Sequence, residues 1–235
     1  MSTLRGEAGS GVSRAPYACF NLGDHVGDDP AAVAENRRRL KQEAALPAEP
    51  SWLAQVHGVT VVDLDSARLK GPADGAVARG AGKVCAILTA DCLPIVFATD
   101  SGDRVAAAHA GWRGLAAGIV QATVSAMHRA AVSIGPIDAF LGPSIGASVY
   151  EVGAEVLHAM RRSLPDAEAA FTPLANGKFR ADLPALARQA LAQVEVRSVY
   201  GGRWCTASDP DRFYSFRRER VTGRHAAVIW LRGAV

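Results

Sequence analysis

Three apolar segments follow one another through the middle of the chain with only short gaps between them. They cover residues 84–89, 93–98 and 104–109, and they are built from apolar, β-branched and small residues of the kind that fill buried strands. Strands that succeed each other this directly favour antiparallel or mixed pairing over a doubly wound parallel sheet. The spacing therefore predicts an α+β fold.

The remaining segments alternate without a regular rhythm. The spacing of apolar residues predicts four helices, over residues 30–44, 114–131, 152–162 and 183–194, and the first begins where Asp29 can cap Pro30. Because helices intervene only occasionally, we expect a mixed β-sheet core with helices packed outside it. Further strands are expected near residues 17–21, 51–56, 59–63, 138–142, 196–200, 213–217 and 226–231.

The composition is that of one compact domain. The chain has 235 residues, of which 49% are hydrophobic, so it has ample material for a core. No stretch rich in Gly, Ser or Pro divides it. Only residues 1–15 lack apolar periodicity, and we expect them to form a flexible N-terminal segment before a single domain over residues 16–235.

Charge and cysteine content point to a reducing, aqueous compartment. We find neither a signal-peptide core nor the roughly 18 uncharged apolar residues of a membrane span. The net charge of +3 is small, which disfavours nucleic acid as a partner. Four scattered cysteines do not form a disulfide framework. We therefore expect a cytoplasmic protein with no membrane or nucleic-acid partner, acting as a monomer or small homo-oligomer.

Three potential metal ligands stand at the ends of apolar runs: His57, Cys92 and His109. Two imidazoles and one thiolate form a recognised catalytic zinc set, because three protein ligands leave the fourth tetrahedral position open. No Cys-x-x-Cys or His-x-x-x-His clip holds any pair together, however. The residues alone leave open the alternative of two structural histidines and a buried thiol.

Several motifs are more informative in combination than any one alone. They are Asn21-Leu-Gly-Asp-His25, Gln55-Val-His57-Gly58, Ala73-Asp74-Gly75, Thr89-Ala-Asp91-Cys92-Leu-Pro94, His109-Ala-Gly-Trp-Arg-Gly114, Gly142-Pro-Ser-Ile-Gly146, Tyr150-Glu-Val152 and Phe216-Arg-Arg218. In this order they resemble the laccase-domain family, also called polyphenol-oxidase-like, which includes purine nucleoside phosphorylases and a bacterial peptidoglycan-editing factor. The resemblance begins near residue 17 and implies a mixed-sheet fold with the metal held by His57, Cys92 and His109.

Two residues beside the ligands are candidate catalytic groups. Asp91 precedes the thiolate, and it is either a carboxylate that supports the metal site or accepts a proton there, or a turn residue that bonds its own backbone. Arg113 follows His109 closely at the start of an expected helix, where backbone N–H groups and a planar guanidinium suit a phosphate or carboxylate. A surface ion pair is the alternative for Arg113.

Four more residues are candidates for substrate binding. Arg217 and Arg218 follow an aromatic segment within a family motif, and either is a candidate for an anion of the substrate. Asn21 and Gln55 match the family pattern, although the sequence does not assign their roles.

Copper oxidase chemistry is disfavoured by the count of ligands. A multicopper laccase needs about ten histidines in several His-x-His pairs to hold its copper centres, as that class is known, and this chain has six histidines with no such pair. A blue-copper site would also need a weak axial Met, and none of the three methionines lies near the candidate ligands in sequence. Zinc is therefore the expected cofactor, with copper the less favoured ion.

The leading hypothesis is a zinc-dependent purine nucleoside enzyme, as the resemblance implies. It would split adenosine or inosine with phosphate, and adenosine deamination is a side activity to be tested. One alternative is an amidase that edits peptidoglycan precursors at the same site. Another makes Cys92 a nucleophile activated by His57 or His109. A third is an inert metal-binding or partner-binding protein.

Overall fold

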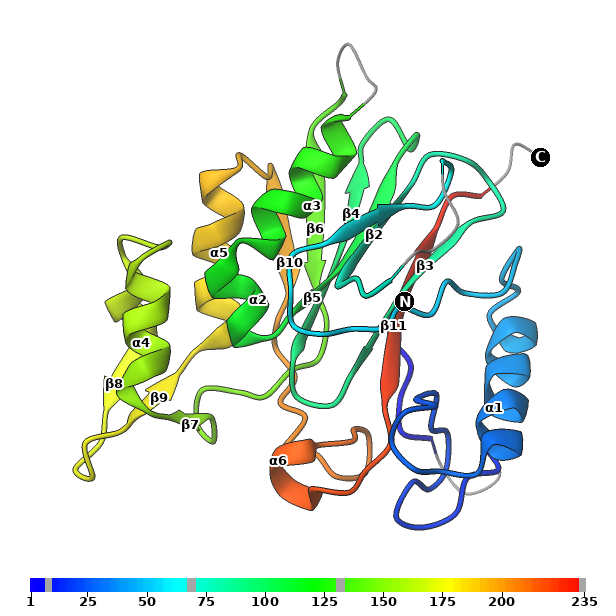
Figure 1. Cartoon of the computed structure of the whole chain (residues 1–235), viewed down its shortest axis with the longest axis horizontal. Helices are drawn as coiled ribbons and strands as arrows, with labels where there is room; N and C mark the ends of the chain where they lie inside the picture. The colour runs from blue at the N-terminus through cyan, green and yellow to red at the C-terminus, as the bar shows by residue number, and fades with distance from the viewer. Residues whose placement is uncertain (7–9, 67–70, 130–133, 233–235) are drawn as a thin grey trace.

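A mixed six-stranded sheet lies at the centre of the part of the chain that the structure describes (Figure 1). The structure is a computed structural model, and it describes residues 1–6, 10–66, 71–129 and 134–232. The four inner strands pair antiparallel, whereas the two outermost pairs are parallel. The strand order is β1 (Val61–Asp63), β2 (Gly75–Ala78), β5 (Val105–Ala110), β4 (Leu93–Thr99), β6 (Ile137–Leu141) and β10 (Ser198–Gly201).

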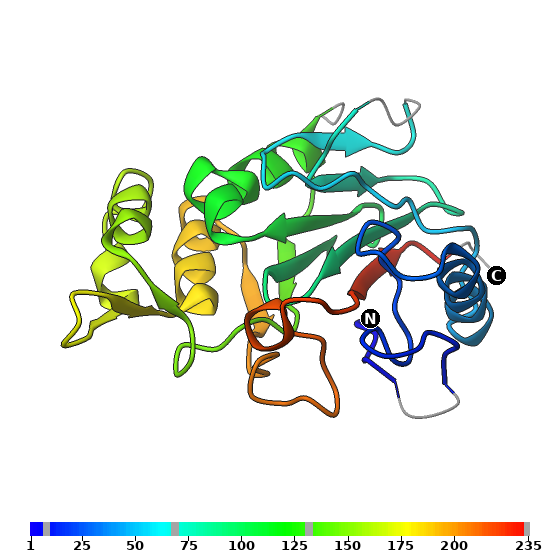
Figure 2. The same cartoon turned by 60° about the horizontal axis from the view of Figure 1, so that its bottom comes forward.

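A second, two-stranded sheet packs against one face of the first. It pairs β3 (Val84–Thr89) antiparallel with β11 (His225–Trp230), two segments far apart in the sequence. The two sheets meet through small and branched side chains such as Ala107, Ile87 and Ala227, which lets their backbones approach closely. Helix α1 (Pro30–Glu43) covers the outer face of the second sheet, as Figure 2 shows from below.

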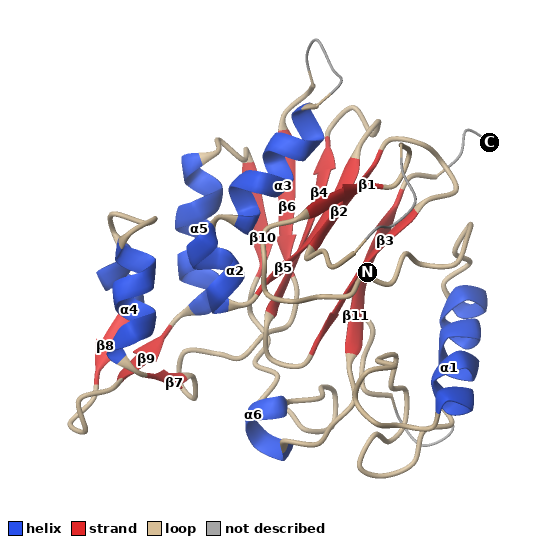
Figure 3. Cartoon of the chain, in the orientation of Figure 1, coloured by secondary structure: helices blue, strands red, loops and turns tan. Residues whose placement is uncertain are grey.

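Helices cover the opposite face of the large sheet (Figure 3). Here α2 (Trp112–Ala117), α3 (Ile119–His128) and α5 (Leu183–Gln193) bury one continuous apolar cluster against β4, β5 and β6. A small outlying unit follows the sheet edge. It comprises α4 (Ala154–Arg161), the 3₁₀ turn Ala167–Ala170 and a three-stranded sheet of β7 (Glu151–Val152), β9 (Phe179–Ala181) and β8 (Phe171–Pro173).

Helix boundaries follow local signals in the sequence. The Asp29 carboxylate accepts a hydrogen bond from the Ala31 N–H, with Pro30 at the first helical position, and Asp182 caps α5 in the same way through the Ala185 N–H. Gly118 lies between α2 and α3 with φ of 96°, a left-handed conformation that ends one helix and starts the next.

The predicted α+β class with a mixed sheet and outer helices is confirmed, and β3, β4, β5, β6, β10, β11 and the four helical regions lie where expected. The helix expected over 114–131 is two helices, because Gly118 interrupts it, and residues 130 and 131 lie outside the described residues. Residues 17–21 form no strand, with a bend at residue 17 and a turn over 18–20, and residues 51–56 keep only one bridge, at Ser51.

The expected strand at 213–217 is wrong. Ser215 caps a short helix, α6 (Phe216–Glu219), by accepting a hydrogen bond from the Arg218 N–H. Phe213 and Tyr214 before it are buried core residues in an irregular segment. The aromatic content that suggested a strand reflects burial in the core.

The N-terminal segment expected to be loose is paired where the structure describes it. Ser2 forms a bridge with Ala227, and the Thr3 N–H donates to the Ala226 carbonyl, so the segment extends the edge formed by β11. No helix among the described residues is both long and apolar enough to cross a membrane.

Candidate metal centre and cavity

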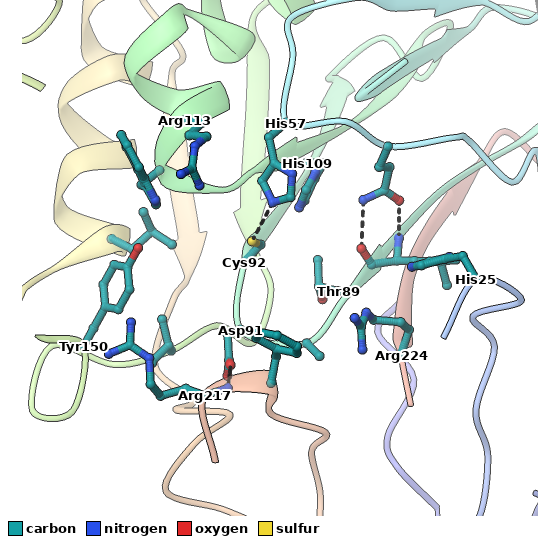
Figure 4. A pocket seen from close by; sticks show the side chains of 17 residues that line it. His25, His57, Thr89, Asp91, Cys92, His109, Arg113, Tyr150, Arg217 and Arg224 are labelled. Carbon is teal, nitrogen blue, oxygen red and sulfur yellow. Dashed lines mark hydrogen bonds between the residues drawn. The ribbon is translucent and has the colours of Figure 1, made fainter. Parts of the chain in front are cut away.

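The three expected ligands converge at one end of the central sheet (Figure 4). His57 lies in the segment before β1, Cys92 in the turn between β3 and β4, and His109 near the end of β5. Their potential ligand atoms all lie within 4.8 Å of one another, and Cys92 Sγ is 3.7 Å from His57 Nε2. Tetrahedral zinc with ordinary bond lengths separates a sulfur and a nitrogen ligand by about 3.6 Å. The donor set and its spacing therefore fit that ion.

Asp74 is the residue that assembles this cluster. Its buried carboxylate lies 2.8 Å from His109 Nδ1 and accepts hydrogen bonds from the backbone N–H groups of Val56, His57 and Gly58. Because Nδ1 of His109 is engaged, Nε2 is the nitrogen left to bind a metal. One carboxylate thus fixes one ligand ring and the backbone that carries another.

Sequence reasoning quoted Asp74 only as part of a motif and gave it no role. A signal was present, since a lone Asp between Ala73 and Gly75 precedes a strand of wholly buried residues. A carboxylate in such surroundings needs hydrogen-bond donors.

Backbone geometry at the cluster is unusual at several points. His57 has φ of 62° and Asp91 has φ of 97°, both in the left-handed region that non-glycine residues rarely adopt. Gly111 is required for a different reason: a Cβ there would lie 2.9 Å from both Cys92 Sγ and His57 Cδ2. The loop after His109 therefore passes against the ligands with no room for a side chain.

The protonation states of the cluster are set by its own members. Burial tends to raise the pKa of the Cys92 thiol, but hydrogen bonds with His109 and His57 outweigh it and lower the pKa to about 6. Burial tends to lower the pKa of His109, whereas Asp74 and Cys92 raise it to about 9. Without a metal, these opposite pKa shifts favour a thiolate on Cys92 beside an imidazolium on His109. Metal binding would release that proton.

The cluster opens into a cavity of about 500 Å³, a size suited to a small organic ligand. In Figure 4 the candidate metal ligands lie in the middle, with Arg113, Tyr150 and Arg217 on one side and Thr89, Arg224 and His25 on the other. Leu88, Ile145 and Leu183 are among its apolar lining residues. The cavity therefore combines apolar walls with cationic groups on both sides of the candidate metal site.

Asp91 lies in this cavity, where both oxygens of its carboxylate accept hydrogen bonds. Thr206 donates its hydroxyl to one oxygen at 2.6 Å, and the Arg217 N–H donates to the other at 2.6 Å. Asp91 thus ties the turn that carries Cys92 to the start of α6. This arrangement favours a positioning role over that of proton acceptor.

Two of the expected arginines reach the cavity. Arg113 is exposed at the start of α2 and stacks its guanidinium 4.4 Å from the Trp112 ring centroid. Arg217 is also exposed, stacks on Tyr150 and donates to the Glu151 carbonyl at 2.8 Å. Both lie where a charged substrate group can reach them.

Arg218 is not among the residues that line the cavity. Its guanidinium donates to the backbone carbonyls of Thr206, Ala207 and Phe213. These hydrogen bonds stabilise the segment before α6. The sequence did not distinguish it from its neighbour Arg217, because adjacent residues at a helix start point in different directions.

Asn21 is fully buried and serves the backbone. Its amide donates to Asp28 and the Gly23 carbonyl and accepts from the N–H groups of Gly23 and Arg224. Gln55 does line the cavity, but its side chain also pairs with both backbone groups of Leu88. The contacts of both residues are structural.

Comparison with known proteins shows the family to which this chain is similar. The family model described as multi-copper polyphenol oxidoreductase laccase matches residues 3–232. A purine nucleoside phosphorylase of Pseudomonas aeruginosa is 51% identical over 222 residues, covering 94% of this chain and 89% of the relative. The purine nucleoside phosphorylase YfiH of Escherichia coli is 46% identical over 222 residues, covering 94% of this chain and 90% of its own length.

Solved structures agree with these matches. A Neisseria meningitidis protein superposes with a TM-score of 0.89 at 44% identity, covering 99% of this chain and 93% of that one. YlmD from Geobacillus stearothermophilus superposes with a TM-score of 0.90 at 32% identity, covering 99% and 91%. The chain therefore belongs to the multi-copper polyphenol oxidoreductase laccase family.

Proposed function

We propose that this protein is a zinc-dependent purine nucleoside phosphorylase that cleaves adenosine and inosine. The observation that carries the proposal is the cluster of His57, Cys92 and His109 opening into a cavity large enough for a nucleoside. Relatives that are 46% and 51% identical over 94% of the chain carry the name purine nucleoside phosphorylase, which supports the same activity here.

The donor set favours zinc. Two imidazoles and a thiolate suit zinc, and when bound the ion supplies a Lewis acid that polarises an oxygen of substrate or phosphate. The described residues hold one group of three possible metal ligands, and the whole chain has six histidines, which disfavours a multicopper centre.

The chain's own residues would bind and orient the two substrates. We assign Arg113 and Arg217 to attraction of the anion toward the cavity, where both guanidinium groups are exposed. Asp91 would hold the Cys92 turn against the segment that carries Arg217, through the two hydrogen bonds of its carboxylate. The apolar walls would exclude water from the ribose carbon that phosphate attacks.

A product assay tests the proposal. Inosine and adenosine are supplied to the zinc-loaded protein with and without inorganic phosphate, and free base and ammonia are measured separately. We expect base release only with phosphate, its loss on chelation and its return with zinc. Equal release without phosphate would make the enzyme a nucleoside hydrolase. No turnover of either nucleoside would defeat the proposal and favour editing of a peptidoglycan precursor.

One further candidate function has an observation of its own. The lowered pKa of Cys92 and its position 3.7 Å from His57 Nε2 also suit a cysteine nucleophile with a histidine base. Alkylation separates the two functions. A coordinated Cys92 should resist a thiol reagent until zinc is removed, whereas a nucleophilic Cys92 should react in an active, metal-free enzyme and abolish its activity.

A further inference from the structure

A buried hydroxyl on the cavity wall has no partner in the described part of the protein. Thr89 ends β3, is 2% exposed and lines the cavity, and its Oγ1 makes no hydrogen bond to any described residue. Buried hydroxyls are almost always paired, because leaving one unpaired forfeits the bonds it would make with water. The described protein supplies no partner for Thr89, which leaves a ligand or a water molecule in the cavity to supply one.

Arg224 lines the same cavity as Thr89, and the sheet register brings its backbone near the end of β3. His225 is the cross-strand partner of Thr89, so the residue just before it approaches the end of β3. Figure 4 shows Thr89 and Arg224 together on one side of the cavity, with His25 at the edge.

The Arg224 side chain is partly buried, and hydrogen bonds to backbone carbonyls fix its orientation. Its Nη1 donates to the carbonyls of Thr222 and Gly223 at 2.9 and 3.0 Å, and its backbone N–H donates to Asn21 Oδ1. Within the described ranges, no carboxylate forms a direct ion pair with it, and the charges of Cys92 and Asp91 act on it only from a greater distance. A guanidinium held this way has donors left for a ligand and a charge left to be balanced.

The other two arginines that line the cavity are more exposed to solvent than Arg224. Arg113 and Arg217 are exposed, and each stacks on an aromatic ring. Water screens both of them, whereas Arg224 has lost part of its hydration and interacts with the charges of Cys92 and Asp91 only at a distance, without a direct ion pair. Among the three, Arg224 therefore gains most from an anion.

We propose that Arg224 and Thr89 form an oxyanion subsite, and that the group bound there is a phosphate. A guanidinium edge and a hydroxyl can together donate to two or more oxygens of a tetrahedral anion. The choice of phosphate rests on the proposed function, but the existence of an anion subsite does not. The phosphate is either free inorganic phosphate or a phosphate ester on the substrate.

Direct binding measurements test the subsite without turnover. Inorganic phosphate is titrated calorimetrically into zinc-loaded wild type, Arg224→Ala, Thr89→Val and a control, Arg203→Ala, which removes an exposed arginine that does not line the cavity. We expect about 10- to 150-fold weaker binding for Arg224→Ala and about 2- to 10-fold for Thr89→Val, with Arg203→Ala unchanged. Arg224→Lys should recover part of the loss and serves as the test if Arg224→Ala does not fold.

A second series removes the metal as a competing anion site. The same titrations in the His57→Ala background should keep the Arg224 dependence, because the subsite does not use the ion. Equal phosphate affinity in Arg224→Ala and wild type would overturn the proposal, as would an equal loss in Arg203→Ala.

Nucleotide and nucleoside probes identify the source of the phosphate. Tighter binding of inosine 5′-monophosphate than inosine, lost in Arg224→Ala, assigns the subsite to a phosphate ester. Arg224-dependent binding of inorganic phosphate together with inosine assigns it to free phosphate. Arg224-dependent phosphate binding in a protein that leaves nucleosides intact would defeat the proposed function and keep the subsite. Phosphorolysis that is unchanged in Arg224→Ala and Thr89→Val would support the proposed function and overturn the subsite.

Discussion

At the scale of single residues, Asp74 has the widest influence on the site. Its carboxylate accepts from three backbone N–H groups and lies 2.8 Å from His109 Nδ1, and these contacts lower its own pKa against the opposing effect of burial. A neutral amide in its place cannot accept from all four donors, since its NH₂ group is itself a donor.

Asp74→Asn should therefore bind zinc about 10- to 100-fold more weakly than wild type. A competition titration against a coloured chelator measures this. Asp138→Asn is the matched control, because it breaks a surface ion pair with Arg197 far from the ligands in the fold. Wild-type zinc affinity in a folded Asp74→Asn protein would show that the carboxylate does not orient the ligands.

Gly111 is needed at the same cluster for a purely steric reason, because no side chain fits there. The methyl group of Gly111→Ala would meet Cys92 Sγ and His57 Cδ2 at 2.9 Å. Overpacking of this kind costs about 1–3 kcal/mol, which corresponds to about 5- to 150-fold in zinc affinity if the metal-bound arrangement bears it all. Gly102→Ala is the control, since it has a positive φ but open space. It should reduce stability and leave zinc affinity unchanged, and a similar loss of zinc in both variants would contradict this account.

At the scale of elements, the break between α2 and α3 depends on Gly118. Its φ of 96° is unfavourable for an L-residue, while the nearest atom to an added Cβ is the Gln121 side-chain oxygen at 3.5 Å. Gly118→Ala should thus cost about 1–2 kcal/mol through backbone conformation alone. Urea unfolding measures it, with the exposed helical variant Ala117→Ser expected to stay within about 0.5 kcal/mol of wild type. No loss in Gly118→Ala would mean that the two helices can join at little cost.

The sequence predicts some elements better than others for physical reasons. The strands β3, β4 and β5 are wholly or almost wholly buried, so their apolar runs are long and unbroken. The short strand β2 was missed because Gly75–Ala78 is made of small residues, which suit a close packing of sheets that only the tertiary structure reveals. The strand expected at 213–217 failed because aromatic burial occurs in irregular segments too.

The sequence likewise predicts some residues of the site and misses others. The three candidate metal ligands were singled out by their chemistry and assigned together by the family resemblance, and the structure brings them together. Asp74, Thr89 and Arg224 act through hydrogen bonds and register between distant strands, which no local pattern records. Arg217 and Arg218 could not be separated by sequence, since only the direction of each side chain distinguishes them.

At the scale of the whole molecule, a buried histidine couples stability to pH. His225 joins β11 to β3 and is fully buried between Phe213 and Tyr214, and burial together with Arg224 lowers its pKa to about 3. The unfolded chain takes up this proton near pH 6.5 and the folded chain does not. The stability contributed by neutral His225 is therefore present above pH 6.5 and falls as the pH drops from 6.5 toward 3.

Removing the imidazole should flatten this dependence. Between pH 7 and pH 5, wild type should lose about 2 kcal/mol more unfolding free energy than His225→Leu, because other titrating groups are shared and cancel. Urea unfolding at the two pH values gives both numbers. Neither ring nitrogen has a partner among the described residues, so leucine leaves no donor or acceptor stranded there. Parallel losses in the two proteins would rule out His225 as the origin.

The carboxylate of Asp74 also fixes the electrical balance of the site. A divalent ion bound by two neutral imidazoles and one thiolate carries a net charge of about +1, and the Asp74 carboxylate, joined to His109, brings the assembly to about zero. Such a centre can polarise an oxygen without drawing an anion to itself over long range. On the proposed function, the arginines would then supply the positive charge that attracts an incoming phosphate, and the metal would activate the substrate.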